Sequence, residues 1–321
     1  MVAVNIGARI STCLCILWLC VSGCAMERPD GRVADRDGGI LDVTVDGFSP
    51  MDGEPLGDLE NASGVWMLLM QDRICVLSGV GDPVDNVIWT RFLVQVEETG
   101  ETPILRQKVR LCEQTLSPLP FDFVTVVPER LTRGLPELDV SGFLVNRELG
   151  GDYITEPFID LWGAEGIGLD DPMPMSADDE RVVDQDGDGE PGVSLTVTAA
   201  DGSPICDVQV VQRTRIQFNG QVVSARRIEG DVDVLSAKTV LAASSPLCGG
   251  GEIASNRGRT FFKLVRVDGQ YESPTADADG DGVIDCSDIR RNFSNIESVY
   301  GLELDVPDVN NCLAPAEEQS P

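Results

Sequence analysis

Between residues 60 and 270, apolar and polar residues alternate in the short runs that are typical of β-strands. The segment 103–112 shows the pattern clearly, because its basic residues occupy every second position. A strand with this period presents one face to a core and the other to solvent. The two faces of this segment are Leu105, Val109 and Leu111 on the apolar side and Arg106, Lys108 and Arg110 on the basic side.

Similar runs predict many strands at short spacing and no long amphipathic helix before residue 270. The predicted strands are 64–71, 87–98, 103–112, 121–128, 137–145, 152–163, 192–200, 206–218, 221–235, 238–244 and 259–267. Turn-forming tripeptides recur between them, namely Thr99-Gly100-Glu101, Asp201-Gly202-Ser203 and Asn219-Gly220-Gln221. This pattern predicts an all-β fold, either an antiparallel β-barrel or a β-sandwich.

After residue 288 the apolar period changes from that of a strand to that of an α-helix. The residues on one face of such a helix are Ile289, Phe293, Ile296 and Tyr300. The residues just before 276 lack a helical pattern, because they include Pro274. The sequence therefore predicts a small C-terminal tail over 271–321, in which an acidic loop leads into a single helix.

Residues 1–23 have the pattern of an N-terminal targeting segment. Arg9 precedes an apolar run from about residue 10 to residue 21, which is too short to span a bilayer as a mature helix. The run ends in Val-Ser-Gly-Cys, which resembles a lipobox. The resemblance implies cleavage before Cys24 and lipid attachment to that residue; a plain secretory signal peptide is the alternative.

The segment 24–60 is rich in Gly, Asp and Pro, and we expect it to be a flexible acidic tether. Ala25 follows the expected lipid-attachment residue. In the sorting rule that the resemblance brings with it, an Asp there means retention in the inner membrane. We therefore expect a lipid-anchored protein of the bacterial cell envelope, with the outer membrane favoured. The anchor makes the membrane a partner.

Charge and composition exclude several classes of function. The 321 residues carry a formal net charge of −30, which repels phosphate backbones, so nucleic acid is rejected as a partner. The chain contains no histidine, so Ser-His-Asp and Cys-His catalysis and every His-ligated metal site are excluded. No pair of carboxylates stands out as a catalytic pair, and we expect no enzyme activity.

Export fits the cysteines of the mature chain, because an even number in an oxidising compartment favours disulfides. These residues are Cys75, Cys112, Cys206, Cys248, Cys286 and Cys312. Six cysteines allow fifteen pairings. Pairing of chain neighbours is the simplest, and it predicts the bonds 75–112, 206–248 and 286–312.

The acidic loop of the tail has the register of an EF-hand calcium loop. Ca²⁺ prefers several oxygen ligands, and alternate carboxylates on a tight loop supply them. The expected ligands are Asp277, Asp279, Asp281, the Val283 carbonyl, Asp285 and Asp288, with Gly282 at the sharp turn. Asp in the last position also resembles the calcium loops of dockerins and thrombospondin type 3 repeats. We expect a calcium ion with a stabilising role.

A second acidic loop repeats the first half of this pattern. Asp184, Asp186 and Asp188 occupy positions 1, 3 and 5, and Gly189 occupies position 6. The pattern is incomplete, because position 12 is Leu195. Calcium binding here is therefore a weaker prediction, with Glu190 as the next acid and Asp178, Asp179 or Glu180 as further oxygen donors. A solvated acidic turn is the alternative.

Several segments of the body resemble an uncharacterised family of predicted bacterial lipoproteins. The most specific is the block DQDGDGEPGV at 184–193, and GVW at 64–66, LWG at 161–163 and RTFFKLVRVD at 259–268 accompany it. The resemblance implies location and architecture and brings no activity with it. The GVW start is also similar to that of lipocalin-like barrels. The body is predicted to span 61–270, with halves at about 61–165 and 190–270 and an acidic linker at 166–189.

These features predict a non-enzymatic, lipid-anchored envelope protein that binds or scaffolds a partner and is stabilised by calcium and disulfides. The alternative is a lipocalin-like carrier whose barrel holds a small apolar ligand. A glycoside hydrolase that uses two carboxylates is less favoured, because nothing singles out a pair. A dockerin-like adaptor is less favoured too, because the tail has a single loop and helix.

Overall fold

The computed structural model describes residues 57–77, 84–100, 104–116, 123–199, 201–245, 248, 252–255 and 260–302. The predicted signal peptide, the predicted lipid-attachment residue Cys24, most of the tether and Cys312 lie outside these residues. The prediction of an all-β fold with one small C-terminal helix is confirmed. Among the described residues, neither helix is long and apolar enough to cross a membrane.

Twelve strands and two helices make up the described chain. The strands are β1 (Gly64–Leu77), β2 (Val84–Glu98), β3 (Ile104–Leu116), β4 (Phe123–Val126), β5 (Leu138–Leu144), β6 (Asp152–Thr155), β7 (Phe158–Trp162), β8 (Val193–Ala199), β9 (Pro204–Ser224), β10 (Arg227–Ala243), β11 (Glu252–Ser255) and β12 (Phe261–Arg266). The helices are α1 (Glu129–Gly134) and α2 (Cys286–Tyr300).

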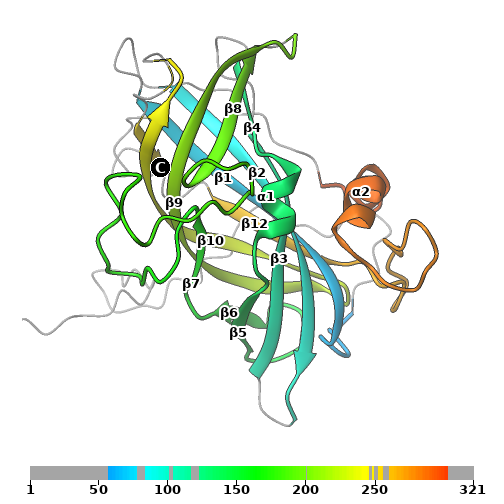
Figure 1. The fold of residues 1–321 in the computed structure, drawn as a ribbon. Helices are drawn as coiled ribbons and strands as arrows, with labels where there is room; N and C mark the ends of the chain where they lie inside the picture. The colour runs from blue at the N-terminus through cyan, green and yellow to red at the C-terminus, as the bar shows by residue number, and fades with distance from the viewer. Residues whose placement is uncertain are drawn as a thin grey trace, which may run out of the picture. The chain divides into compact units, whose positions relative to one another are not determined.

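Eight of the strands pair into a closed antiparallel ring (Figure 1). Its order is β1–β2–β3–β4–β8–β9–β10–β12, and β12 pairs with β1 again. The ring follows the order of the chain, as in an up-and-down barrel. It is uneven, because β3 pairs with β5 over its first half and with β4 near its end. Strand β9 also changes partners along its length, because successive parts of it pair with β8, β7 and β6.

Alternate residues of the strands point into the ring and form the main core. On β1, Trp66, Leu68 and Met70 belong to this interior core, whereas Met67 and Leu69 between them face outward. The alternation predicted for β3 is confirmed, since its apolar face is buried in the same core and its basic face is exposed. Full burial of each large apolar side chain contributes roughly 1.5–3 kcal/mol. The interior of the ring is therefore the main source of stability.

Helix α2 covers outward-facing residues of β1, β2 and β12 and forms a second core with them (Figure 1). The apolar face predicted for this helix is confirmed, since Ile289, Phe293, Ile296 and Tyr300 are buried. The guanidinium of Arg91 on β2 lies 3.5 Å from the centroid of the Phe293 ring, which is a cation–π contact. The outer face of β1 and β2 is thus apolar because a helix packs against it.

Arg266, the last residue of β12, ties the end of the sheet to the segment that enters β1. Its guanidinium is fully buried and lies 5.1 Å from the centroid of the Trp66 ring. Its Nη1 donates to the Asn61 carbonyl at 2.7 Å, and its Nη2 donates to the Ser63 carbonyl. Asp268 accepts from its Nε at 3.0 Å and compensates the buried charge.

The turn predicted at Asn219-Gly220-Gln221 is wrong. Strand β9 runs through this tripeptide to Ser224, and the turn lies at 225–226. Gly220 is instead paired with Gly230 of β10, and a Cβ at Gly220 would lie 2.7 Å from the Phe262 ring. The glycine is needed for close approach inside the ring, which the local sequence does not reveal.

Two other parts of the chain have strand boundaries that differ from the prediction. The predicted element 152–163 is two strands, β6 and β7, which are interrupted at Glu156 and Pro157. Proline has no N–H to donate to a strand ladder, so the break falls there. The predicted strands 221–235 and 238–244 are not separate, because β10 is continuous over most of both.

Candidate metal-binding loops

Three aspartates of the C-terminal loop come together as their spacing predicts. One carboxylate oxygen from each of Asp277, Asp279 and Asp281 lies within 4.8 Å of the other two. Asp277 closes the loop, because it accepts hydrogen bonds from the N–H of Gly280 at 2.7 Å and of Gly282 at 3.0 Å. Gly282 has a φ of 83°, which is the left-handed conformation that favours glycine.

The other predicted ligands of this loop lie outside the cluster of three. Asp285 caps α2, and its Oδ1 accepts from the N–H of Ser287 at 2.7 Å. Asp288 is almost fully buried, and its two oxygens accept from the N–H of Asp285 at 3.0 Å and of Ala278 at 3.2 Å. These contacts form a capping box, in which both carboxylates accept hydrogen bonds from backbone N–H groups at the N-terminus of α2. Val283 is exposed.

A disulfide joins the start of α2 to the ring. Cys286 is bonded to Cys112 of β3, across a sequence separation of 174. The predicted bonds of Cys112 with Cys75 and of Cys286 with Cys312 are therefore wrong. Pairing of chain neighbours minimises loop length, but packing of α2 against β2 and β3 decides which sulfur atoms meet.

The remaining predicted bond is confirmed, because Cys206 of β9 is bonded to Cys248. The backbone of Cys75 lies in β1, where it pairs with that of Ala254. The free thiol or bonded state of Cys75 and of Cys312 lies outside what the structure describes, as does the predicted lipid attachment at Cys24.

The loop between β7 and β8 repeats the same local geometry. Carboxylate oxygens of Asp184, Asp186 and Asp188 lie within 4.8 Å of one another. Asp184 accepts from the N–H of Gly187 at 2.8 Å and of Gly189 at 2.9 Å, as Asp277 does in the C-terminal loop. The two loops therefore share one fold around their first aspartate.

The middle aspartate of this loop differs from the other two in its surroundings. The side chain of Asp186 has no exposed surface, whereas Asp184 and Asp188 are exposed residues. Its Oδ2 accepts from the Nε of Arg130 on α1 at 3.1 Å and from the N–H of Ser194 at 3.3 Å. Its Oδ1 is buried and has no hydrogen-bond partner among the described residues.

The additional acids proposed for this loop do not join the cluster. Asp179 forms an ion pair with Arg181 at 2.7 Å, and the hydrogen bonds from Arg181 lower the pKa of Asp179 to about 2. Glu190 accepts from the side-chain amide of Gln209 on β9 at 3.1 Å. Asp178 and Glu180 are exposed and lie outside the group of three.

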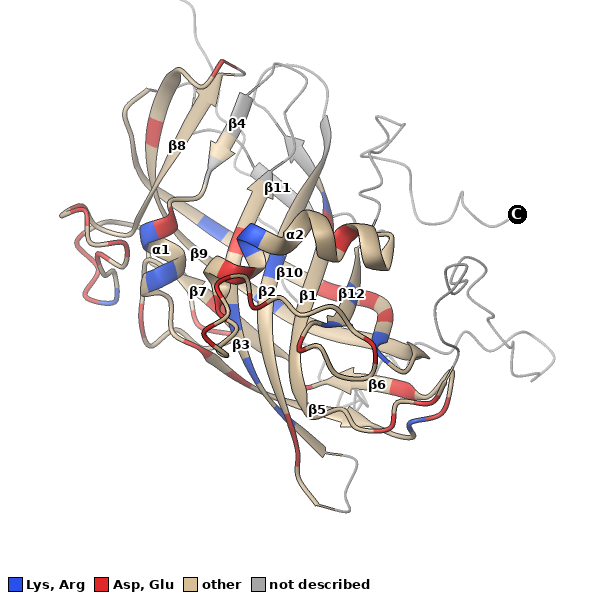
Figure 2. Cartoon of the chain, turned by 90° about the vertical axis from the view of Figure 1, so that its right-hand side faces the viewer, with Lys and Arg blue, Asp and Glu red and all other residues tan. Residues whose placement is uncertain are grey.

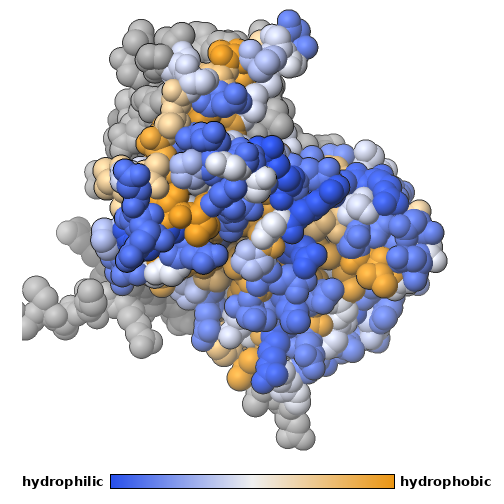
Figure 3. All heavy atoms as spheres, in the orientation of Figure 1, coloured by the Kyte–Doolittle hydropathy of each residue, from blue (hydrophilic) through white to orange (hydrophobic). Residues whose placement is uncertain are grey.

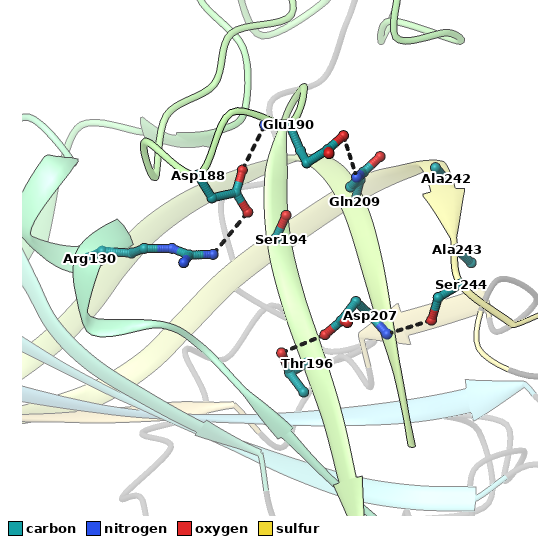
Figure 4. Close-up of a pocket in the computed structure, with 10 residues that line it drawn as sticks. All are labelled: Arg130, Asp188, Glu190, Ser194, Thr196, Asp207, Gln209, Ala242, Ala243 and Ser244. Carbon is teal, nitrogen blue, oxygen red and sulfur yellow. Dashed lines mark hydrogen bonds and ion pairs between the residues drawn. The ribbon is translucent and has the colours of Figure 1, made fainter. Parts of the chain in front are cut away.

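A polar pocket of about 510 Å³ lies beside the loop, on the outer face of β8 and β9 (Figure 4). Its residues on β8 and β9 alternate with residues of the interior core, so they face away from the ring. Hydroxyl, carboxylate and amide groups line it together with two alanines at the end of β10. The lining residues are Arg130, Asp188, Glu190, Ser194, Thr196, Asp207, Gln209, Ala242, Ala243 and Ser244.

Ion pairs connect the two loops through the two helices, whose charged residues are visible in Figure 2. Arg130 pairs with Asp186 at 3.1 Å and with Asp188 at 2.9 Å. The neighbouring Glu129 pairs with Arg290 of α2 at 2.9 Å. The pairs Arg130–Asp188 and Glu129–Arg290 are partly exposed, and such pairs contribute only about 0–1 kcal/mol each, so their main effect is to orient the helices and loops.

Hydrogen bonds lower the pKa of one carboxyl of the loop between β7 and β8, that of Asp188. The Ser194 side chain is the largest influence on Asp188, and with Glu190 and Arg130 it lowers the pKa of that carboxyl against the opposing effect of burial. By contrast, burial raises the pKa of Asp72 on β1 to about 6, and likewise that of Asp160 on β7 to about 6. The lowered pKa keeps Asp188 in its charged form at neutral pH, which is the form that binds a cation.

Sequence reasoning missed the residues that α1 contributes. Six residues of helix are less than two turns, too few for an apolar period to be visible. Arg130 is nevertheless the residue that contacts two aspartates of the first loop. A Pro followed by an acidic residue, here Pro128 and Glu129, is a helix-start signal that could have drawn attention to it.

Comparison with known proteins supplies no family. No protein-family model matches the chain, and no curated protein matches it in sequence. The resemblance to bacterial lipoproteins therefore stays a prediction.

Proposed function

We propose that this chain is a lipid-anchored, extracytoplasmic protein of the bacterial envelope that binds or scaffolds a partner without catalysing a reaction. The observation that carries the proposal is the bond between Cys112 and Cys286. It supports residence in an oxidising compartment, where disulfides persist. It also favours a structural role for the tail, since the bond holds the acidic loop and α2 on the wall of the ring.

Calcium is the cation proposed for the tail. Asp277, Asp279 and Asp281 offer oxygens at close spacing on a loop that is already closed by its own hydrogen bonds. Hard oxygen ligands of this kind suit Ca²⁺. Arg291 lies 3.5 Å from Asp279 and supplies one positive charge nearby. The proposed role of the ion is to neutralise the remaining repulsion and stiffen the approach to α2.

The test is the melting temperature of the full mature chain with EDTA and with millimolar Ca²⁺. We expect Ca²⁺ to raise it, and Asp279→Asn to remove most of the rise that belongs to the tail. Asp139→Asn is the matched control, because Asp139 is an exposed carboxylate on β5 that belongs to neither acidic cluster. Equal melting temperatures in EDTA and Ca²⁺ would exclude a metal in the tail.

The anchor is tested separately from the metal. The intact protein from its own type of cell should fractionate with membranes and show the mass of a lipid-modified Cys24. Cys24→Ala should release it to the soluble fraction. An unmodified N-terminus produced by cleavage at another position would favour the plain secretory alternative.

A second candidate function is that of a carrier for a small apolar ligand, and the closed eight-stranded ring favours it. Against it, apolar side chains from β1, β2, β3, β8, β9, β10 and β12 form one continuous interior core. Native mass spectrometry of protein purified from its own cells distinguishes the two. A bound lipid or small molecule supports the carrier, whereas a single mass equal to the protein alone supports a binding or scaffolding role.

A further inference from the structure

The buried aspartate of the loop between β7 and β8 sets this loop apart from an ordinary acidic turn. Asp186 has a side chain with no exposed surface and an Oδ1 without a hydrogen-bond partner. A buried carboxylate oxygen with no donor is costly, because burial has removed the water that would otherwise solvate it. Oxygens of Asp184 and Asp188 lie within 4.8 Å of an Asp186 oxygen.

The formal charges of the cluster and its surroundings do not balance, and two negative charges are left uncompensated. At their formal charges the three carboxylates count as three negative charges, and Arg130 supplies one positive charge through Asp186 and Asp188. The difference is two negative charges. Arg130 reaches only the Oδ2 atoms of these two aspartates, so it leaves Oδ1 of Asp186 without a partner. A cation with two positive charges would balance this formal charge, and one bound to Oδ1 of Asp186 would also supply the partner that this buried oxygen lacks.

The backbone holds the outer oxygens in place for such an ion. Asp184 is fixed by the N–H groups of Gly187, Asp188 and Gly189. Asp188 is fixed on its other oxygen by the N–H of Glu190 at 2.9 Å. Each carboxylate oxygen can accept more than one contact, so these hydrogen bonds orient the groups and leave lone pairs for a metal.

We infer that Asp184, Asp186 and Asp188 bind one hard divalent cation, Ca²⁺ in an extracytoplasmic setting, with Asp186 as its buried central ligand. The ion joins the loop to β8 and to α1, because Asp186 already contacts Ser194 and Arg130. It lies at the edge of the polar pocket, which Asp188 and Arg130 also line. This site is separate from the loop at 277–288 and does not depend on it.

Calorimetric titration of the metal-free mature chain with CaCl₂ tests the site. In a chain whose tail loop is disabled by Asp277→Asn and Asp279→Asn, one Ca²⁺ should still bind. Adding Asp186→Asn, which preserves size, should lower the affinity at least tenfold. The control is Asp170→Asn, an exposed acid of the same region, which should change nothing. No binding to the tail-disabled chain, or binding that Asp186→Asn leaves unchanged, would overturn the inference.

A second variant separates an ion site from a purely structural cluster. Arg130→Gln removes the only cation that contacts these carboxylates among the described residues. In EDTA it should lower the melting temperature, and Ca²⁺ should then raise it more than it raises that of the unaltered chain. An equal Ca²⁺ response in both proteins contradicts a cation at this loop, whether or not the variant is destabilised.

Discussion

At the scale of single residues, two glycines decide how closely β9 and β10 can approach. Gly220 and Gly230 face each other across the two strands, and the ring of Phe262 lies against the space where a side chain would be. Phe262 in turn contacts Phe218 with ring centroids 4.9 Å apart. The packing of Phe218 and Phe262 inside the ring of strands therefore depends on the absence of a Cβ at Gly220.

Gly220→Ala should destabilise the protein by about 1–3 kcal/mol, the usual cost of overpacking a core. The added Cβ would lie 2.5 Å from the Glu229 carbonyl oxygen and 2.7 Å from the Phe262 ring. Urea unfolding measures the change. Gly57→Ala is the control, because its Cβ would meet nothing closer than 3.9 Å. Equal stability of both variants would show that β9 and β10 can separate at no cost.

Asp72 is a second residue whose surroundings matter, because its burial makes the stability of the fold depend on pH. It is buried, and the Thr260 hydroxyl donates to its Oδ1 at 2.9 Å. Burial raises its pKa to about 6. The folded protein therefore favours the protonated acid. Its contribution to stability is complete below the usual pKa of about 4 and is lost as the pH rises through about 6.

Asp72→Asn should raise the free energy of unfolding at pH 7.5 by about 1–3 kcal/mol, because it removes a buried charge and keeps an acceptor for Thr260. It should also flatten the fall in stability between pH 4 and pH 6.5. Urea unfolding over a pH series measures both effects. Asp139→Asn should leave the slope as it is; an unaltered slope in Asp72→Asn would mean that this carboxyl is ionised in the fold.

At the scale of elements, α2 is attached to the ring by a core, a capping box and a disulfide. The disulfide closes the longer of the two described loops, with a sequence separation of 174 against 42 for the other. On the chain-entropy model such bonds stabilise by about 5 and about 4 kcal/mol, respectively. The attachment of α2 therefore contributes to the stability of the whole fold, although the sequence of the tail differs from that of the strands.

Replacing Cys112 and Cys286 by Ser should loosen α2 while the ring persists. Apolar contacts of the second core remain, so we expect faster amide exchange over 286–300 and a loss of about 3–5 kcal/mol in unfolding free energy. Hydrogen exchange followed by mass spectrometry measures the first effect. The double Ser variant of Cys206 and Cys248 serves as control and should leave exchange in α2 unchanged.

At the scale of the whole molecule, the acidic surface is the dominant feature. The chain carries a formal net charge of −30. The face in Figure 3 is mostly hydrophilic, with hydrophobic residues in small groups between the polar ones. Self-repulsion among so many like charges destabilises a compact state and is screened by salt.

Raising NaCl from 10 mM to 300 mM, with EDTA present, should therefore increase the melting temperature by a few degrees, about the effect of 1 kcal/mol in a protein of this size. KCl at the same ionic strength should act equally, because screening does not depend on the identity of the ion. A decrease in melting temperature with either salt would show that favourable ion pairs outweigh the repulsion.

The sequence by itself determined what depends on near neighbours along the chain. Period-two alternation gave the strands and their buried faces, as in Leu105, Val109 and Leu111. The helical period gave α2 and its apolar face, and the alternate aspartates gave both clusters of three. Each of these follows from backbone geometry over a few residues.

Only the tertiary structure decided which distant segments meet. It closed the ring between β12 and β1, gave Cys112 its partner Cys286, and placed Arg130 on the loop at 184–188. It also assigned Gly220 to close packing in place of a turn. These outcomes depend on packing summed over the whole core, because many pairings satisfy the local pattern equally well and only one buries all the apolar faces together.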